Sequence, residues 1–471
     1  MSWKYNALPD TGDSPLPRYN DQIEDEISIL DPMSIENENE QEDIPDINIL
    51  GGTSNLKHAF FNMTNSIVGA GIVGIPMAFL NSGLLMGTIL MIILTFMNDW
   101  TLRLIVVNTK LSGSKTYTGC ISHTYGNFGK IVVLFSQGFF AVGGSIGFTI
   151  IIGDSIPHIL RSVFSEQVKE SSLLSFLLSR NFIITFCICF ICFPLSLIRD
   201  ISLLARASGL ALISMFMIIS IVIFKAPFVD EIYKGSISNW EYIFNTNIFQ
   251  GISVISFALV CHHNTTFIYD SIKVPTLDRF NRIIHYSCAI SGFLCALLGI
   301  CGFMNFGDKT KGNILNNFPN NDWLINIARF CFGLNMITTL PLEIYVIREV
   351  IKDLYTIFKR RKEPSFEAQN FTTFQHAFVT SILLLIPLGV SIMTCNLGAV
   401  LEIVGATSGS LLAYILPPLC YNKMTKGNKS KLQQAPYYAC ATFGFMVMIL
   451  STFQTISQSM NSSSGTNHCA E

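Results

Sequence analysis

The fold of this chain is decided by the segment Asn65-Ser66-Ile67-Val68-Gly69-Ala70-Gly71-Ile72-Val73-Gly74-Ile75-Pro76. The surrounding stretch is apolar and long enough to cross a bilayer, yet three glycines and a proline interrupt it. Hydrocarbon holds no water to bond the backbone groups that an interruption frees, so an unwound turn survives only inside protein or beside a polar cavity. Because broken helices at membrane depth are where secondary transporters hold their substrates, we expect a ligand site here.

The composition is that of a membrane protein. Half of the 471 residues are hydrophobic, only 13% are charged, and 37 are phenylalanine. A span needs about 20 mostly apolar residues. The sequence predicts an all-α polytopic protein with eleven transmembrane helices, at about 59–79, 84–107, 130–156, 181–198, 203–224, 247–270, 283–305, 323–351, 375–394, 397–419 and 436–457.

Three regions are predicted: a tail (1–52), a transmembrane domain (55–457) and a short C-terminal tail (458–471). The first 50 residues contain thirteen Asp or Glu against two Lys or Arg and have no apolar period, which is typical of a disordered acidic tail. We expect this tail to stay in the cytosol, where it is available to protein partners. Most of the thirteen cysteines lie inside spans, so the sequence suggests no disulfide framework. The Cys187, Cys189 and Cys192 group has no nearby His or carboxylate, so we expect neither a metal nor a cofactor.

Positive charges on the predicted loops indicate the orientation. With the N-terminus in the cytosol, the cytosolic loops carry eighteen Lys or Arg and the opposite loops seven. The positive-inside rule therefore favours a cytosolic N-terminus and, with an odd number of spans, a lumenal C-terminus.

A second interruption occurs in the sixth span, where the run Cys261-His262-His263-Asn264-Thr265-Thr266 is polar at membrane depth. If spans one to five and six to ten are two halves, both interruptions fall in the first helix of a half. The fifth and tenth spans also share a small-residue patch, in which Ala207-Ser208-Gly209 corresponds to Thr407-Ser408-Gly409. Since each half has an odd number of spans, the second half enters the membrane from the opposite side, which predicts a five-plus-five inverted repeat.

The chemistry of a broken helix suits an amino acid. The N-terminus of a half-helix presents unpaired N–H groups and a positive dipole end, which suit a carboxylate, while freed carbonyls suit a cation. Gly69 and Gly71 allow the backbone to approach a ligand closely. The alternative is that Gly69, Gly71 and Gly74 form a packing face between helices, as small residues often do in membranes.

The residues from Phe61 to Pro76 resemble the first-span signature of the amino acid/auxin permease family, and Cys261-His262-His263-Asn264 followed by Ile268-Tyr269 resembles its sixth span. The likeness is to the sodium-coupled neutral amino acid and fungal vacuolar amino acid transporter branches of that family, over residues 55 to 457. The resemblance implies the five-plus-five transporter fold, with discontinuous first and sixth helices, and the movement of small neutral amino acids. It implies no cofactor and no nucleic-acid partner.

The resemblance also implies positions for the site. The α-carboxylate would be bound by Gly69, Ala70 and Gly71. The amino group and side chain would contact Phe257, Ala258 and Cys261, and His262 is included as a substrate or proton-coupling residue. The family's cation site would correspond to Asn65 and Val68, opposite Thr338 and Thr339. Hydroxyls and carbonyls are suitable ligands for sodium, but Thr338-Thr339-Leu340-Pro341 also suits a simple helix kink.

The coupling ion is open between H⁺ and Na⁺. His262 and His263 titrate near neutral pH, and Glu343, Glu402 and Asp154 are intramembrane ionisable residues, which are functional candidates by default. Asp99 and Arg103 at i,i+4 are expected to neutralise each other.

The expected location is an internal membrane of the vacuolar or lysosomal type. Plasma-membrane members of the family usually carry a disulfide and glycosylated asparagines on exterior loops, and the loops 157–180 and 225–246 have neither cysteine nor Asn-x-Ser/Thr. A vacuole supplies a pH gradient, so we expect proton-coupled exchange, with no direction specified.

Two alternatives come from other functional classes. An amino acid sensor could retain the site and signal through the acidic tail. A membrane enzyme is disfavoured, because the spans contain no clustered metal ligands, no serine-histidine-acid set and no phosphate loop.

Overall fold

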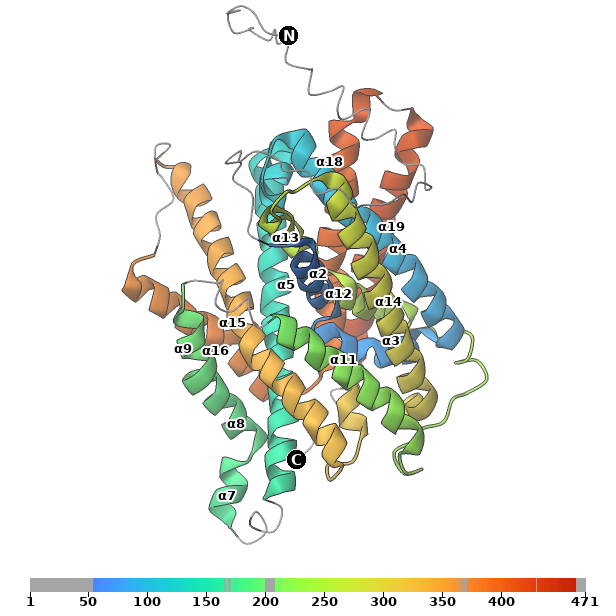
Figure 1. The fold of residues 1–471 in the computed structure, drawn as a ribbon. Coiled ribbons are helices and arrows are strands. Elements are labelled where there is room, and N and C mark those ends of the chain that lie inside the picture. The colour runs from blue at the N-terminus through green and yellow to red at the C-terminus, as the bar shows by residue number, and fades with distance from the viewer. Residues whose placement is uncertain are drawn as a thin grey trace, which may run out of the picture. The chain divides into compact units, whose positions relative to one another are not determined.

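The computed structural model describes residues 54–164, 167, 171–199, 208–363, 366, 371–428 and 430–462. The acidic tail, the Ala207 end of the fifth-span patch and most of the C-terminal tail lie outside these residues. The described part is helical, and its single β-bridge joins Ser54 to Ile272. The helices are α2 (Leu56–Val68), α3 (Ile75–Ser82), α4 (Leu84–Ser112), α5 (Tyr117–Val163), α7 (Ser172–Leu177), α8 (Arg180–Phe186), α9 (Phe193–Leu197), α11 (Ser208–Lys225), α12 (Ile248–Leu259), α13 (Thr265–Ser271), α14 (Leu277–Phe306), α15 (Trp323–Arg360), α16 (Thr373–Met393), α17 (Leu397–Val404), α18 (Leu416–Met424) and α19 (Lys431–Ser462) (Figure 1).

Eleven candidate membrane spans are present among the described residues, which confirms the predicted number. Several are composite: α2 and α3 form the first span, α8 and α9 the fourth, α12 and α13 the sixth, and α17 and α18 the tenth. Element α5 is longer than the predicted third span, because it also includes a polar helix that begins at Tyr117 and is separated from the span by a kink. It bends at Gly126, whose φ of 64° is accessible to glycine at little cost.

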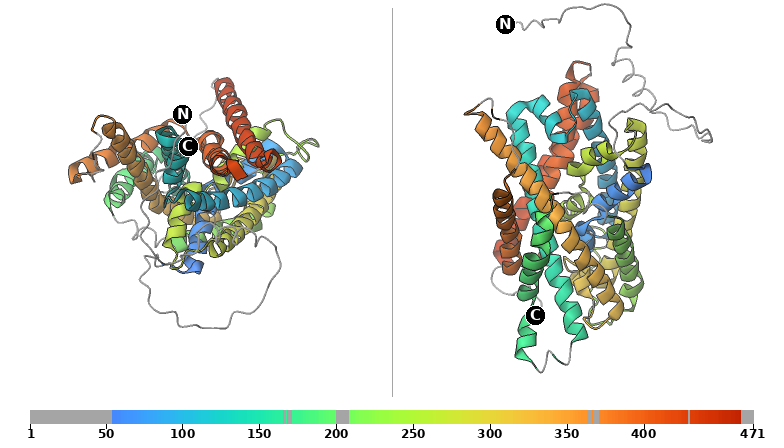
Figure 2. Two further views of the ribbon diagram at one scale, coloured as in Figure 1. Left: turned by 90° about the horizontal axis from the view of Figure 1, so that it is seen from above. Right: turned by 60° about the vertical axis from the view of Figure 1, so that its left-hand side comes forward.

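The two interrupted spans lie among the longer helices (Figure 1). In that view α2 and α12 occupy the middle, with α5 and α15 on one side and α4 and α14 on the other. Packing follows the same arrangement, since α12 contacts α3, α14 contacts both α2 and α4, and α15 lies along α5. Figure 2 shows the helices from above, side by side with their ends toward the viewer.

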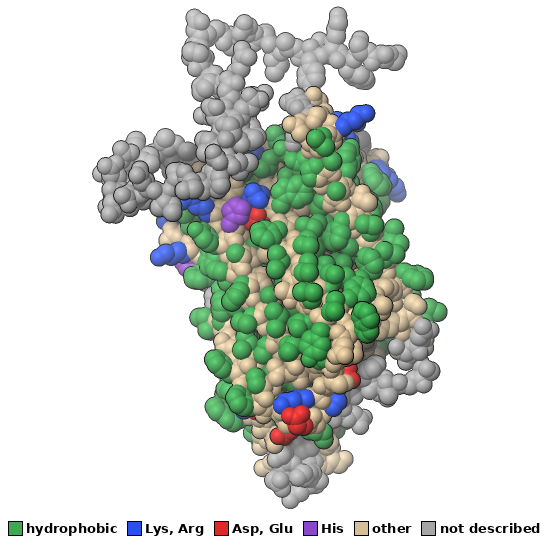
Figure 3. Space-filling view, turned by 90° about the vertical axis from the view of Figure 1, so that its right-hand side faces the viewer, with side chains coloured by type: hydrophobic (Ala, Val, Ile, Leu, Met, Phe, Trp, Pro, Cys, Tyr) green, Lys and Arg blue, Asp and Glu red, His purple; other side chains and the backbone are tan. Residues whose placement is uncertain are grey.

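The outer surface is apolar where a bilayer would meet it. Large hydrophobic side chains such as Phe96, Phe190 and Phe224 are mostly exposed. Figure 3 shows hydrophobic side chains covering the middle of one face, while charged side chains collect toward its two ends. A patch of this extent is incompatible with water and matches a hydrocarbon belt between two interfaces.

One cysteine departs from the expectation that the chain has no disulfide. Cys395, in the connection between α16 and α17, is disulfide-bonded. The eleven other cysteines within the described ranges are free, among them Cys187, Cys189 and Cys192. A cysteine between two spans carries no spacing signal that sequence reasoning could use. The described residues contain no group of three His, Cys, Asp or Glu placed to hold a metal ion.

Candidate substrate site at the two broken helices

The first span breaks at Gly69. Helix α2 ends at Val68, Gly69 leaves helical geometry with φ −36° and ψ −153°, and the short 3₁₀ segment η1 (Ala70–Gly74) leads into α3. Pro76 lies in the first turn of α3, where its missing N–H costs no hydrogen bond. Glycine at the break and proline just beyond it therefore explain why one apolar stretch forms two helices.

The sixth span breaks where its polar run begins. Helix α12 ends at Leu259, Val260 is extended, and the 3₁₀ segment η4 (His262–Asn264) leads into α13. Together with the break at Gly69, this confirms the predicted discontinuous first and sixth helices. The inverted relation of the two halves stays a prediction.

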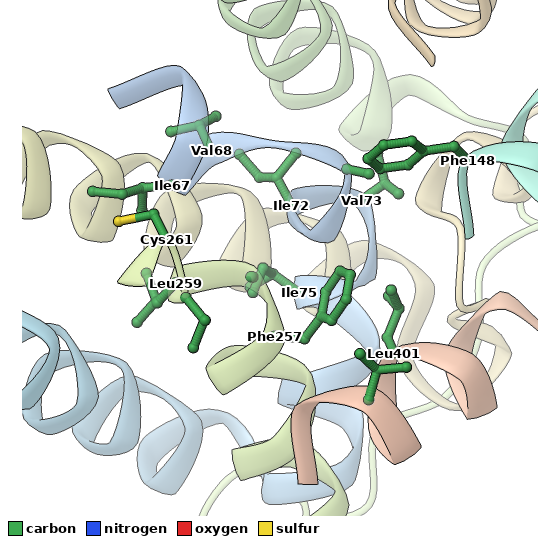
Figure 4. Close-up of a cluster of buried hydrophobic side chains, with 14 of the residues drawn as sticks. Ile67, Val68, Ile72, Val73, Ile75, Phe148, Phe257, Leu259, Cys261 and Leu401 are labelled. Carbon is green, nitrogen blue, oxygen red and sulfur yellow. The ribbon is translucent and has the colours of Figure 1, made fainter. Parts of the chain in front are cut away.

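The two breaks lie against each other. The Asn264 amide donates to the Ser66 hydroxyl at 3.1 Å, and the Cys261 thiol lies 3.7 Å from the Met63 sulfur. Figure 4 shows Cys261 beside Ile67, close to the end of α2. Residues almost 200 positions apart therefore form one buried centre.

The glycines of the first break differ in the space around them. A Cβ on Gly71 would lie 2.6 Å from the Cα of Ala258 in α12, and one on Gly74 would lie 2.5 Å from a methyl group of Leu401 in α17. These two glycines are packing positions between η1 and its neighbouring helices. A Cβ on Gly69 would meet nothing closer than 3.8 Å, and its nearest neighbour would be the Asn65 carbonyl. Of the three glycines at this break, Gly69 is therefore the one where an added Cβ would make only ordinary van der Waals contacts.

Aromatic side chains border the second break. Phe257 stacks on Phe140 of α5 with ring centroids 5.2 Å apart, and Phe140 also lies 5.1 Å from the His263 ring. Phe257, Ala258 and Cys261 are all buried. Phe140 was missed by sequence reasoning, because it is one of many phenylalanines in apolar helices and only its contact across the fold distinguishes it.

His262 is fully buried and directed toward a neighbouring helix. Its Nε2 lies 2.9 Å from the Thr101 hydroxyl of α4. This hydrogen bond gives one ring nitrogen of His262 a partner within the protein, and the role of His262 in substrate contact or proton coupling stays a prediction. Its Nδ1 has no hydrogen-bond partner within the described part of the chain.

The residues expected to hold a cation are on α2 and α15. Thr338 and Thr339 both donate their hydroxyl hydrogens to the Asn335 carbonyl, at 2.9 and 2.7 Å, one turn earlier in α15. The hydroxyl oxygens thereby keep lone pairs for another partner. No hydrogen bond among the described residues links Asn65 to Thr338 or Thr339. The predicted cation site, which places Asn65 of α2 opposite these threonines of α15, therefore stays a prediction.

A polar cavity of about 480 Å³ opens at the end of the helices where α5 ends and α8 begins. This volume is in the range of small-molecule sites. Asp154 and Arg180 face each other across its wall at 3.7 Å, and Asn316 donates to Asp154 at 2.9 Å. The cavity also reaches Gly312, whose carbonyl oxygen would lie 3.6 Å from a Cβ on Gly74. It therefore approaches η1 from one side.

The opposite end is closed beside the start of α2. Ser54 forms a parallel bridge with Ile272, in which the Ser54 N–H donates to the Ser271 carbonyl at 2.9 Å and Lys273 donates to Ser54 at 3.1 Å. This bridge ties the outer ends of the two broken spans together. The described residues therefore present a cavity toward one side and a backbone link on the other.

The ionisable residues within the spans have different partners. Asp99 forms the expected pair with Arg103 at 2.9 Å and a further contact with His285 at 2.7 Å, which sequence spacing does not reveal. Glu402 accepts hydrogen bonds from Asn81 and Thr455. Arg348 is directed to the Ser196 carbonyl and the Thr380 hydroxyl, not toward Glu343.

Comparison with known proteins identifies the family. The family model described as "Transmembrane amino acid transporter protein" matches residues 52–457. "Vacuolar amino acid transporter 2" of Saccharomyces cerevisiae is 46% identical over 417 residues, covering 88% of this chain and 86% of the relative. The "Putative sodium-coupled neutral amino acid transporter 11" of Danio rerio is 32% identical over 400 residues, covering 85% of this chain and 86% of the relative. The chain therefore belongs to the transmembrane amino acid transporter family and is a multi-pass amino acid transporter, not an enzyme.

Proposed function

We propose that the protein carries neutral amino acids across a vacuolar or similar internal membrane by secondary active transport coupled to a proton gradient. The single observation that carries the site is the contact between the two helix breaks, through the hydrogen bond from Asn264 to Ser66 next to the uncrowded Gly69. The internal membrane is supported by the 46% identity to a relative named as a vacuolar transporter. The expected orientation places the N-terminus in the cytosol and the cavity on the lumenal side.

The proposed binding mode follows from backbone chemistry. The α-carboxylate would accept hydrogen bonds from N–H groups of Gly69, Ala70 and Gly71, at the positive end of the half-helix that continues into α3. The amino group would be bound by carbonyls at the second break. The substrate side chain would lie against Phe257, Ala258 and Cys261. Because Gly71 touches Ala258 in this conformation, the substrate would enter on the Gly69 side of that contact.

A neutral substrate is favoured by the residues around the breaks. Neither the segment 62–79 nor the segment 248–267 contains an Asp, Glu, Lys or Arg. A charged substrate side chain would lack a partner there, and an unpaired charge at membrane depth is costly.

Alternating access is supported by the asymmetry of the two ends. A cavity approaches η1 from the side where α8 begins, whereas the Ser54 and Ile272 bridge closes the other end of the broken spans. Opening this bridge while the cavity closes would expose the same site to the opposite side.

Transport and coupling are tested together in proteoliposomes. Purified protein would be reconstituted, and uptake of labelled neutral amino acids would be measured with a pH gradient, a sodium gradient or neither. We expect saturable uptake that the pH gradient stimulates. If only the sodium gradient stimulated uptake, the protein would be a sodium symporter and the proposed proton coupling would be wrong. The relatives named as sodium-coupled and the hydroxyls of Thr338 and Thr339 favour this alternative. Absence of saturable uptake under both gradients would contradict transport of the tested amino acids.

The site itself is tested with Gly69→Val. Because a Cβ at Gly69 meets no close neighbour, the variant should fold and reach the membrane, yet its methyl groups would fill the proposed carboxylate position and abolish uptake. Gly389→Val is the matched control, since Gly389 lies on the exposed face of α16 and a Cβ added there would have nothing within 4 Å. Normal uptake by Gly69→Val would contradict this site.

A further inference from the structure

Glu343 stands apart from the other carboxyl groups within the spans. One of its oxygens, Oε2, is buried and has no hydrogen-bond partner in the part of the chain that the structure describes. By contrast, Asp99 has Arg103 and His285, Asp154 has Arg180 and Asn316, and Glu402 has Asn81 and Thr455. An unpartnered buried carboxylate oxygen costs free energy, so a transporter retains one only where it has a use.

Glu343 faces the part of α5 that borders the second break. A Cβ on Gly144 would lie 3.9 Å from the Glu343 carboxyl carbon. Phe140, one turn earlier on the same face of α5, stacks on Phe257 and contacts His263. The carboxyl group is therefore near the buried centre and not at a membrane interface, where solvent would stabilise its charge.

The same carboxyl lies one turn from the predicted cation residues. Residues four positions apart share a helix face, so Glu343 and Thr339 lie on one side of α15. Thr339 already donates its hydrogen to Asn335, which leaves the Thr339 hydroxyl oxygen as an acceptor on the same face as the carboxylate. Such a face attracts a cation, and a proton that binds the carboxylate is the simplest one.

No other charge neutralises Glu343 among the described residues. In α15, Arg348 bonds to Ser196 and Thr380, and Lys352 pairs with Glu349 at 2.7 Å. The packed neighbours contribute charges that are engaged elsewhere: Asp154 of α5 with Arg180 of α8, Lys225 of α11 with Asp322, and His376 of α16 near the Leu197 carbonyl. Gly144 is the residue of α5 that faces Glu343, and the other ionisable side chains of α5 lie 14 or more positions away from it: Tyr117, Cys120, His123, Tyr125, Lys130, His158 and Arg161. The segment η2 (Cys187–Cys192) contributes the thiols of Cys187, Cys189 and Cys192, and that of Cys192 is directed to the Ile337 carbonyl at 3.8 Å.

We propose that Glu343 is the residue that binds and releases the coupling proton. The proposal rests on the proton coupling proposed above. One H⁺ from the acidic side bonds to a carboxylate oxygen of Glu343. The resulting carboxylic acid stays neutral while the protein changes conformation and the site opens to the other side. The O–H bond then breaks, H⁺ is released there, and the carboxylate is restored. No other bond changes. Neutralisation removes the cost of moving a buried charge between two environments of different polarity.

The test is Glu343→Gln, which resembles the protonated group in shape and lacks charge and proton. Reconstituted protein would be assayed for exchange of labelled against unlabelled amino acid without a gradient, and for accumulation driven by a pH gradient with the membrane potential clamped. One coupled proton per amino acid sustains about a tenfold concentration ratio for each pH unit. We expect Glu343→Gln to retain exchange and to lose this accumulation, together with the substrate-dependent pH change inside the vesicles.

Glu402→Gln is the matched control. In this variant the same change is made at a carboxyl group whose two oxygens already accept hydrogen bonds from Asn81 and Thr455. The amide oxygen of the new side chain can still accept from Asn81, and its N–H can donate to the Thr455 hydroxyl. This variant should keep both exchange and gradient-driven accumulation.

Four results would overturn the assignment. The first three concern Glu343→Gln: it could retain accumulation, it could lose exchange together with accumulation, or it could fail to give folded protein. The fourth is a loss of gradient-driven accumulation in Glu402→Gln alone. The second and third would make Glu343 a structural residue, and the fourth would transfer the proton to Glu402. Failure of the proposed proton coupling is distinct, because the wild-type protein would then show exchange without any response to the pH gradient.

Discussion

Arg329 is the largest of the fully buried side chains. Its guanidinium donates to the carbonyls of Leu315, Phe318 and Pro319 and to the Asn326 side chain, at 2.8 to 3.3 Å. These bonds hold the connection between α14 and α15, which forms part of the cavity wall. The charge is satisfied by carbonyl dipoles instead of a carboxylate, so Arg329 has a structural role.

Replacing Arg329 with methionine keeps much of the length of the side chain and leaves several buried carbonyls without donors. We expect the free energy of unfolding to fall by about 3 kcal/mol or more. The midpoint of thermal unfolding in detergent would measure the loss, with exposed Arg361→Met as the control. An unchanged midpoint would show that water replaces the guanidinium at no cost.

Individual residues mark the limit of sequence-based prediction. Gly69 and Gly71 are equivalent in the sequence, yet a Cβ would make only ordinary van der Waals contacts at Gly69 and would collide with Ala258 at Gly71. Phe140 and Arg329 were missed because their importance depends on contacts that no local pattern encodes. The packing-face alternative therefore applies to Gly71 and Gly74, while the substrate-site hypothesis is best tested at Gly69.

At the scale of elements, Asp322 begins α15 and connects it to α11. Its carboxylate accepts the N–H groups of Leu324 and Ile325 as an N-cap, and it pairs with Lys225 at 2.7 Å. Asp322→Ala removes both interactions and should cost about 1–2 kcal/mol, whereas Asp322→Asn retains the cap and should cost under about 1 kcal/mol. Thermal unfolding of the two variants would separate the contribution of the N-cap to the free energy of unfolding from the contribution of the ion pair. Equal losses would assign the whole effect to the ion pair.

The pH dependence of this connection follows from the pKa of Asp322. Partial burial raises the pKa, but the Lys225 ammonium and the two N–H groups outweigh burial and hold the pKa below its ordinary value of 3.8. The stabilisation is therefore fully present above pH 3.8 and is lost only as the pH falls through the lower folded-state value. We expect the stability difference between wild type and Asp322→Asn to stay constant from neutral to mildly acidic pH, which unfolding curves at several pH values would check.

Elements were more predictable than residues, because each follows from a local signal. Apolar runs of span length predicted the eleven helices, and the glycine and polar interruptions predicted both breaks. The exceptions are equally instructive. The polar segment of α5 before Gly126 forms a helix of its own. It packs against α18 through hydrogen bonds such as that from Tyr125 to the Leu419 carbonyl, and hydropathy carries no information on such support.

At the scale of the whole molecule, the described membrane domain begins where the acidic tail ends. Ser54 is held by the backbone of α13's final turn and by Lys273, and the family match begins at residue 52. All the residues of the transport machinery proposed above lie after Ser54 in the sequence. The order and number of spans were predicted from sequence. Sequence reasoning named Glu343, Glu402 and Asp154 together as candidates and did not separate them, because only the fold shows which buried carboxyl lacks a partner.

Deleting residues 2–50 should accordingly leave amino acid uptake within about twofold of the full-length rate. Such a change is under about 0.5 kcal/mol in activation free energy, too small for the loss of a binding group. The measurement compares both proteins in the same vesicles, at matched amounts, with and without the pH gradient. A sensor that retains the transporter fold would behave differently, since the truncated chain would bind amino acid normally while the cellular response to it disappears. Loss of uptake with binding preserved would instead make the tail part of the transport cycle.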